Sequence, residues 1–244
     1  MLLQDKTAIV YGAAGPVGAA VAGAFAREGA RVVLAGRTRQ TLVKVADQIR
    51  DAGNAAQTAV VDVTDTAAMR AHAAEVAAAS GGIDIAFNAT SNDDLQGIPL
   101  LDMDLSDFTR PVSKAIAAHF TIATVTARHM LDRGGVILVM GGGREAIPLL
   151  GGSHVAWSAL AGLCRQLAAE LGPRGIRVAW LLSPGSPDPG AATPGDGEPL
   201  PDGTLIGRHP SYQEVANAAV FAASDWAATM TAAEINLTGG AVID

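Results

Sequence analysis

Three glycines stand at even spacing near the start of the chain, in the stretch YGAAGPVG. They fit a G-x-x-G-x-x-G pattern between an apolar run, KTAIVY, and a segment of helical spacing, VGAAVAGAFAREG. Glycines permit positive φ angles and close backbone approach, and a helix N-terminus presents unpaired N–H groups to an anion. The motif predicts a loop that binds phosphate; the alternative is a plain tight turn. The residues expected to contact the phosphates are Gly12, Gly15, Pro16, Val17 and Gly18.

The residues that follow the second apolar run, RVVLAG, indicate which dinucleotide the loop serves. A dinucleotide-binding fold that prefers NAD usually carries an acidic residue here, which binds the ribose 2′-hydroxyl. This chain has Arg37, Thr38 and Arg39 instead, and a cation suits a 2′-phosphate. We therefore expect NADP(H) as the cofactor, held in part by Arg37 and Thr38. The alternative is that the two arginines are solvated charges at the start of a helix.

The elements that must position these motifs alternate along the chain. Apolar runs typical of buried strands are separated by segments of helical spacing, and strands joined by crossover helices run parallel. We therefore expect a doubly wound α/β sheet in one domain, residues 1–244. The expected strands are residues 6–11, 31–36, 58–63, 83–88, 135–140 and 176–182. The expected helices are residues 17–29, 41–53, about 65–79, about 106–131, and a long one from Ser153.

One segment breaks this alternation. Residues 183–210 are dense in proline and glycine and form a longer connection than strands and helices usually need. The segment follows the carboxyl end of the sixth expected strand, where ligands bind in sheets of this kind. Two interpretations stay open: an ordered lid over the cofactor cleft, and a plain insertion.

Composition excludes several classes of protein. A chain of 244 residues can bury roughly 70% of its unfolded surface, so its core needs no metal or disulfide. The net charge of −7 argues against nucleic acid or an anionic membrane as a partner. The single cysteine, Cys164, excludes an internal disulfide and is expected to be a core residue. With no charged leader and no apolar run near ~18 residues, we expect a cytoplasmic protein that acts on a small molecule.

Several segments, in order along nearly the whole chain, resemble the short-chain dehydrogenase/reductase family. IDIAFNATS is similar to the family's I-D-x-x-x-N-N-A-G, and Asp62 with Val63 resembles its adenine-contact pair. LAAELGPRGIRV and the stretch from VANAAVF to NLTGG resemble its later segments. The resemblance implies a parallel sheet of seven strands in the order 3-2-1-4-5-6-7 and a nicotinamide cofactor across the strands' carboxyl ends. It also implies that Asn88 and Ala89 line the cofactor site and that the chain assembles as a homodimer or homotetramer.

The family's chemistry rests on an Asn-Ser-Tyr-Lys tetrad, and the matching positions here hold other residues. Each position is anchored on its own local segment, namely ARHM, GGVILVM and LAAEL. The residues found there are, in order, Ala115, Gly142, Ser153 and Trp157. In the family the tyrosine is the proton donor and the lysine lowers its pKa. Because a positioned general acid contributes about 10²–10⁴ in rate, carbonyl reduction by the family's usual route is not expected.

Four residues near these positions are candidates for replacement chemistry. His154 is the leading proton donor, and Ser153, Lys114 and His119 are the others. Each has a structural alternative: a helix cap for Ser153, a structural or surface role for the histidines, and a solvated or interface charge for the lysine. Trp157 either stacks on a bound ring or fills the space that the nicotinamide needs.

Three hypotheses on function follow. The first is an NADP(H)-dependent oxidoreductase that reduces an activated C=C, an imine or a carbonyl, since hydride donation belongs to the cofactor. The second is a non-redox enzyme, such as an isomerase, dehydratase or cyclase, that uses the same pocket. The third is a noncatalytic family member that binds a dinucleotide. We rank them in that order, because the phosphate-binding half of the site is intact and a fold does not fix a function.

Overall fold

The computed structural model describes residues 1–183 and 204–243, in which seven strands form one parallel sheet. The strand order is β3-β2-β1-β4-β5-β6-β7, so the predicted topology is confirmed. The strands are β1 Thr7–Tyr11, β2 Arg31–Gly36, β3 Ala56–Val60, β4 Ile85–Asn88, β5 Gly135–Met140, β6 Ile176–Leu182 and β7 Ala233–Asn236. Every neighbouring pair of strands is parallel, as crossover helices require.

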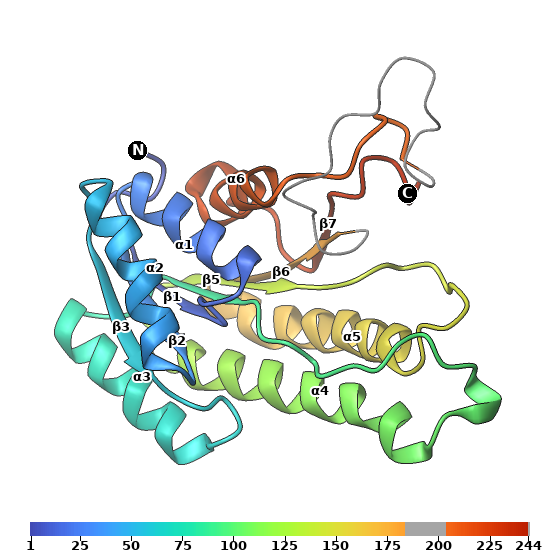
Figure 1. Cartoon of the computed structure of the whole chain (residues 1–244). Helices are drawn as coiled ribbons and strands as arrows, with labels where there is room; N and C mark the ends of the chain where they lie inside the picture. The colour runs from blue at the N-terminus through green and yellow to red at the C-terminus, as the bar shows by residue number, and fades with distance from the viewer. Residues whose placement is uncertain (184–203, 244) are drawn as a thin grey trace.

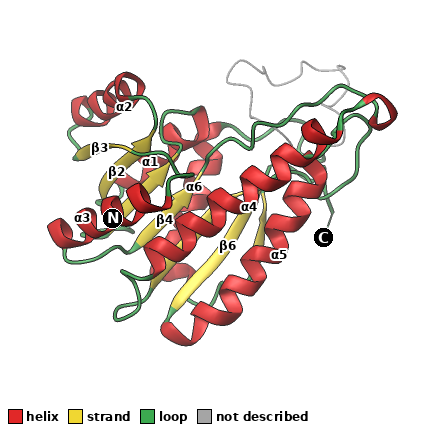
Figure 2. Ribbon diagram, turned by 90° about the horizontal axis from the view of Figure 1, so that it is seen from below, coloured by secondary structure: helices red, strands yellow, loops and turns green. Residues whose placement is uncertain are grey.

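Six α-helices of the described residues cover the two faces of the sheet (Figures 1 and 2). They are α1 Pro16–Arg27, α2 Arg39–Asp51, α3 Thr66–Ser80, α4 Leu105–Ala127, α5 Ser153–Leu171 and α6 Tyr212–Ala223. The helices α1, α2 and α6 pack on one face, and α3, α4 and α5 pack on the other. Figure 2 shows α4 and α5 side by side across the sheet.

Several predicted boundaries differ from the structure by one or two residues, and two differ by more. The helix expected to reach Leu131 ends at Ala127, because the N–H groups of His129 and Met130 donate to carbonyls only three residues back and tighten the chain into a turn. The strand expected at residues 58–63 is β3, at Ala56–Val60. It ends earlier because Asp62 turns the chain by accepting the N–H of Thr64 at 2.9 Å.

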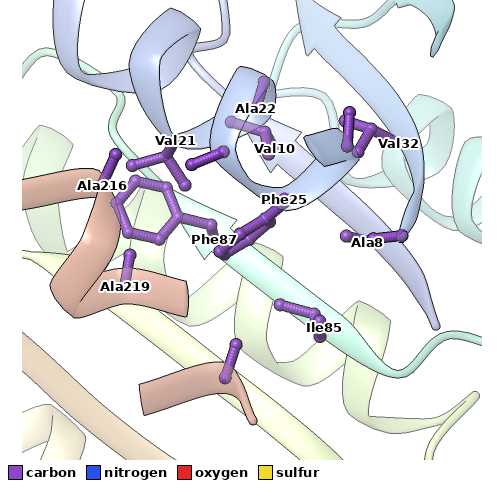
Figure 3. Packing of buried hydrophobic residues seen from close by; sticks show 14 of the residues in the cluster. Ala8, Val10, Val21, Ala22, Phe25, Val32, Ile85, Phe87, Ala216 and Ala219 are labelled. Carbon is purple, nitrogen blue, oxygen red and sulfur yellow. The ribbon is translucent and has the colours of Figure 1, made fainter. Parts of the chain in front are cut away.

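The core on the face of α1 and α6 is built from rings set among small residues (Figure 3). Phe25 of α1 and Phe87 of β4 meet edge to face with their ring centroids 6.2 Å apart. Ala216 and Ala219 of α6 are fully buried in the same cluster. Their small side chains allow α6 to approach the rings closely, which fixes α1 and its N-terminus against the sheet.

The core on the opposite face holds Cys164, which is fully buried as predicted. Burial raises the pKa of its thiol to about 12, so it behaves as a small hydrophobic side chain. Tyr11 of β1 is also fully buried on this face, and burial raises the pKa of its hydroxyl. Neither side chain is therefore a candidate for proton transfer at neutral pH.

The Gly- and Pro-rich segment is described only in part. Residues 184–203 lie outside the described residues, so the prediction of a lid or an insertion at 183–210 stays a prediction. After them, the N–H groups of Leu205 and Ile206 donate to the carbonyl of Gly239 at 2.8 and 3.1 Å. The segment therefore ends beside the turn that follows β7. In the part of the chain described, no helix combines the length and apolar character that a membrane crossing requires.

Candidate functional site

A cavity of about 380 Å³ lies at the carboxyl ends of β1, β2 and β4. Ligands bind in this position in doubly wound sheets. Of the predicted cofactor contacts, those that line it are Gly12, Gly15, Arg37, Thr38, Asp62, Val63 and Ala89. Those that do not line it are Pro16, Val17, Gly18 and Asn88. The last four lie at the start of α1 and at the end of β4, close in sequence to residues that line it.

The glycine turn brings three backbone segments into contact. Gly12 has a φ of +76°, and a Cβ there would lie 2.5 Å from the carbonyl oxygen of Ala89 at the end of β4. A Cβ on Gly18 would lie 2.3 Å from the carbonyl oxygen of Gly12. Gly15 is the N-cap of α1 and provides no side-chain cap. No side chain therefore caps the first N–H groups of α1. That these groups bind an anion stays a prediction.

Charged groups of both signs stand at the rim beyond this turn. The carboxylate of Asp62 accepts the N–H and the hydroxyl of Thr64 at 2.9 and 2.7 Å. These two hydrogen bonds lower the pKa of Asp62, and the charges of Arg37 and Lys114 lower it further. Arg37 and Thr38 line the same rim, where β2 ends and α2 begins. The rim therefore offers a guanidinium group on one side and an ionised carboxylate on the other.

The end of β4 is fixed by a buried contact with α4. The amide nitrogen of Asn88 lies 2.6 Å from Nδ1 of His119, and because an amide nitrogen donates, this ring nitrogen accepts and the proton resides on Nε2. The side-chain oxygen of Asn88 accepts the N–H and the hydroxyl of Thr90, which lines the cavity. Burial lowers the pKa of His119 to about 4. His119 is therefore neutral and holds β4 in place.

Among the four predicted catalytic candidates, Lys114 alone lines this cavity. Its ammonium group is in close contact with Oδ2 of Asp93, and Nε of Arg110 lies 3.8 Å from the same oxygen. The hydrogen bond and the charge of Lys114 lower the pKa of Asp93. Because Asp93 follows β4 and Lys114 belongs to α4, this ion pair crosses from the loop to the helix at the cavity wall.

Ser153 is the first residue of α5 and is 1% exposed. Its hydroxyl donates to Oδ2 of Asp94 at 2.7 Å and accepts the amide of Gln96 at 3.1 Å. The N-cap of α5 is Gly152, so the alternative role of Ser153 as a helix cap was wrong. The side chain instead ties the loop after β4 to α5. Nδ1 of His154 is buried without a partner among the described residues, and His154 does not line the cavity.

Trp157 packs on the backbone at the end of β5. A Cβ on Gly142 would lie 2.0 Å from Cε2 and 2.2 Å from Cδ2 of the indole. The indole thus occupies the space that a side chain at position 142 needs. Trp157 does not line the cavity at the glycine turn; it lines a different cavity. Neither of its two predicted roles, stacking on a bound ring or filling the nicotinamide space, is therefore seen at the glycine-turn cavity. Ala115, the remaining position matched to the tetrad, is 1% exposed on α4.

Sequence reasoning missed Asp94, Gln96 and Thr64, which make the hydrogen bonds described above. The signal for the first two was the polar run SNDDLQ directly after a buried strand, at the edge where ligands bind. Among the described residues, no three His, Cys, Asp or Glu side chains are placed to hold a metal ion.

The sequence and the fold were compared with known proteins. Residues 12–242 match a family model described as "Enoyl-(Acyl carrier protein) reductase". The chain is 32% identical to D-threitol dehydrogenase of Mycolicibacterium smegmatis, over 99% of this chain and 94% of that protein. It is 30% identical to (+)-cis,cis-nepetalactol synthase of Nepeta racemosa, over 98% of this chain and 92% of that protein. A short-chain dehydrogenase/reductase from Serratia marcescens BCRC 10948 has a similar structure, with a TM-score of 0.86 and 27% identity over 98% of this chain and 99% of that one.

The neutral state of His119 gives the unfolding free energy a specific pH dependence. The pKa of His119 is lowered to about 4 in the fold from 6.5, so between these values the unfolded chain binds a proton that the folded chain does not. The unfolding free energy should therefore fall as pH decreases through this range, by up to about 3 kcal/mol from this group. Denaturant unfolding at several pH values should show a shallower dependence for His119→Gln, whose amide oxygen can still accept from Asn88. If the unfolding free energy depended on pH equally in the two proteins, His119 would not be the neutral, buried group described here.

Proposed function

The chain belongs to the short-chain dehydrogenase/reductase family, and we propose that it is an NADP(H)-dependent oxidoreductase that handles the proton without the family's usual tetrad. Members of this family use nicotinamide dinucleotides and act on small molecules, and the relatives of this chain include a dehydrogenase that acts on D-threitol. The observation that carries the proposal is a single cavity. The glycine turn, Arg37 and Lys114 all line it.

The residues of the cavity suit each part of the dinucleotide. The uncapped N-terminus of α1 would bind the pyrophosphate through its backbone N–H groups. Arg37 would form a charge-assisted pair with the 2′-phosphate, and the hydroxyl of Thr38 would add a further donor. Asp62, ionised at neutral pH, would accept a hydrogen bond from the adenine amino group. No acidic residue lies between Gly36 and Gln40 to repel the 2′-phosphate.

The substrate class follows from what the proton-handling residues can do. NADPH supplies a hydride when it is bound, so the protein must orient the acceptor and return a proton. Ala115 and Gly142 carry no group for this, and Ser153 is buried against Asp94. Lys114 is the proton donor that remains on the cavity wall. A substrate that needs little proton assistance, an activated C=C or an imine, therefore suits this site better than a simple ketone.

A non-redox reaction is the second candidate. One relative, 30% identical, is named as a synthase rather than as a dehydrogenase. An isomerase, dehydratase or cyclase would use the same cavity without net transfer of a hydride. A spectrophotometric scan of the nicotinamide absorbance, with a panel of ketones, enones and imines, separates the two: consumption of NADPH supports reduction, and product formation without it supports the second candidate. Binding of NADPH with neither result supports a noncatalytic dinucleotide-binding protein.

Arg37 and Arg39 provide a matched test of the cofactor assignment. Arg37 lines the cavity, whereas Arg39 begins α2 and does not line it. A charge-assisted hydrogen bond contributes on the order of 1.5–3 kcal/mol, so Arg37→Ala should weaken NADPH binding by about 10-fold to 150-fold. Calorimetry should find NADH binding nearly unchanged in this variant and both cofactors unchanged in Arg39→Ala. Equal affinities of the parent protein for NADPH and NADH would refute the assignment.

Lys114 and Lys44 form a second matched pair. Lys114 stands in the cavity wall, and Lys44 is exposed on α2. If Lys114 returns the proton, Lys114→Met should lower the turnover of an accepted enone or imine by about 10²-fold or more. Lys44→Met should leave it unchanged, and calorimetric titration with NADPH would show whether the loss is in turnover or in cofactor binding. Full turnover in Lys114→Met would exclude the lysine as the proton donor.

A further inference from the structure

A second cavity, of about 540 Å³, lies between α5, the carboxyl ends of β5 and β6, and the start of β7. Its size is within the range of sites for small organic ligands, roughly 300–1,000 Å³. It shares no described lining residue with the cavity at the glycine turn. The proposed function uses none of its side chains.

Two indoles form part of its wall. Trp157 of α5 lies against the bare backbone of Gly142, where a Cβ would come within 2.0 Å of the ring. Trp180 of β6 is only 3% exposed, and its indole N–H donates to Oε2 of Glu234 on β7 at 2.8 Å. Both rings are thus fixed by the fold before any ligand arrives. Trp180 is almost completely buried, so the half-buried Trp157 is the indole that a ligand can contact. A fixed aromatic surface favours a flat ligand, because little side-chain entropy is lost on binding.

Three charged side chains of the described residues line the cavity, and they differ in whether they are already hydrogen-bonded or ion-paired within the protein. Glu234 accepts the indole N–H of Trp180 and also binds Arg144, whose Nε lies 2.9 Å from Oε1. Arg165 lines the same cavity with its Cζ 5.0 Å from the ring centroid of Trp180. No acidic side chain of the described residues forms an ion pair with Arg165. Stacking on the indole orients this guanidinium group and leaves its N–H donors for an anion.

We propose that this cavity binds a small aromatic carboxylate. The ring packs against Trp157, and the carboxylate pairs with Arg165. A guanidinium group matches a carboxylate in a bidentate geometry, which makes the charge part of the recognition. Glu234 disfavours a second negative charge nearby, so a monoanion suits the cavity better than a phosphate ester.

Calorimetric titration of the protein, without cofactor, tests this directly. The probe is 2-naphthoate, and the uncharged control is 2-naphthamide, which has the same ring. The parent protein should bind 2-naphthoate saturably, one molecule per chain, and at least 10-fold more tightly than 2-naphthamide. Absence of binding, or equal binding of the two probes, would overturn the proposal.

Variants locate the site. Arg165→Ala should weaken 2-naphthoate binding by about 10-fold to 100-fold, whereas Arg70→Ala, at an exposed position of α3 outside both cavities, should leave it unchanged. Gly142→Ala should displace Trp157, change the near-ultraviolet circular dichroism and weaken binding. An Arg165→Ala protein that binds as the parent does would refute the assignment.

Competition distinguishes this site from the proposed cofactor site. Saturating NADPH should leave 2-naphthoate binding unchanged, because the two cavities have no described lining residue in common. Displacement of 2-naphthoate by NADPH would place the carboxylate in the cofactor cavity and overturn the proposal. A protein that fails to bind NADPH would refute the proposed function and leave the titration with 2-naphthoate a valid test.

Discussion

The close approach of the turn after β1 to the end of β4 is the constraint on which the site depends. A Cβ at Gly12 would lie 2.5 Å from the carbonyl oxygen of Ala89, and one at Gly18 would lie 2.3 Å from the carbonyl oxygen of Gly12. Neither carbonyl can move without disturbing a strand or a helix, so any side chain at these positions would separate β1, α1 and β4. With glycine there, the N-terminus of α1 comes to the carboxyl edge of the sheet. Arg37, at the end of β2, then reaches the same cavity.

In the proposed account, the positions matched to the family's tetrad serve packing and do not carry reactive groups. Two of these positions contact each other: the indole of Trp157 packs on the backbone of Gly142 and fills the space that a side chain there would need. At a third, Ser153 is buried and bound to Asp94, so that it anchors the loop after β4. These contacts support a chemistry in which the cofactor provides the reducing power and the protein provides little proton transfer. They also create the aromatic wall of the second cavity, which would not exist with a side chain at position 142.

The parallel sheet and the glycine turn could be predicted from local patterns in the sequence, whereas the strand order followed from the family resemblance. Apolar runs between helical segments define a parallel sheet, and Gly12 and Gly18 are recognisable from spacing alone. The partners of Ser153 were not predictable in this way, because Asp94 and Gln96 lie on a loop that tertiary packing brings to α5. The same holds for His119, whose neutral state follows from its burial against Asn88 and not from its neighbours in the chain. The end of α4 was wrong because the chain tightens into a turn that the helical spacing does not reveal.

The central claim is that the dinucleotide half of the cleft is retained while the reactive half has been rebuilt. A crystal structure of the complex with NADPH measures this most directly. The account predicts the pyrophosphate at the N-terminus of α1, the 2′-phosphate against Arg37, and the indole of Trp157 still packed on Gly142. A pyrophosphate bound elsewhere, or a nicotinamide ring that displaces Trp157 from Gly142, would contradict it.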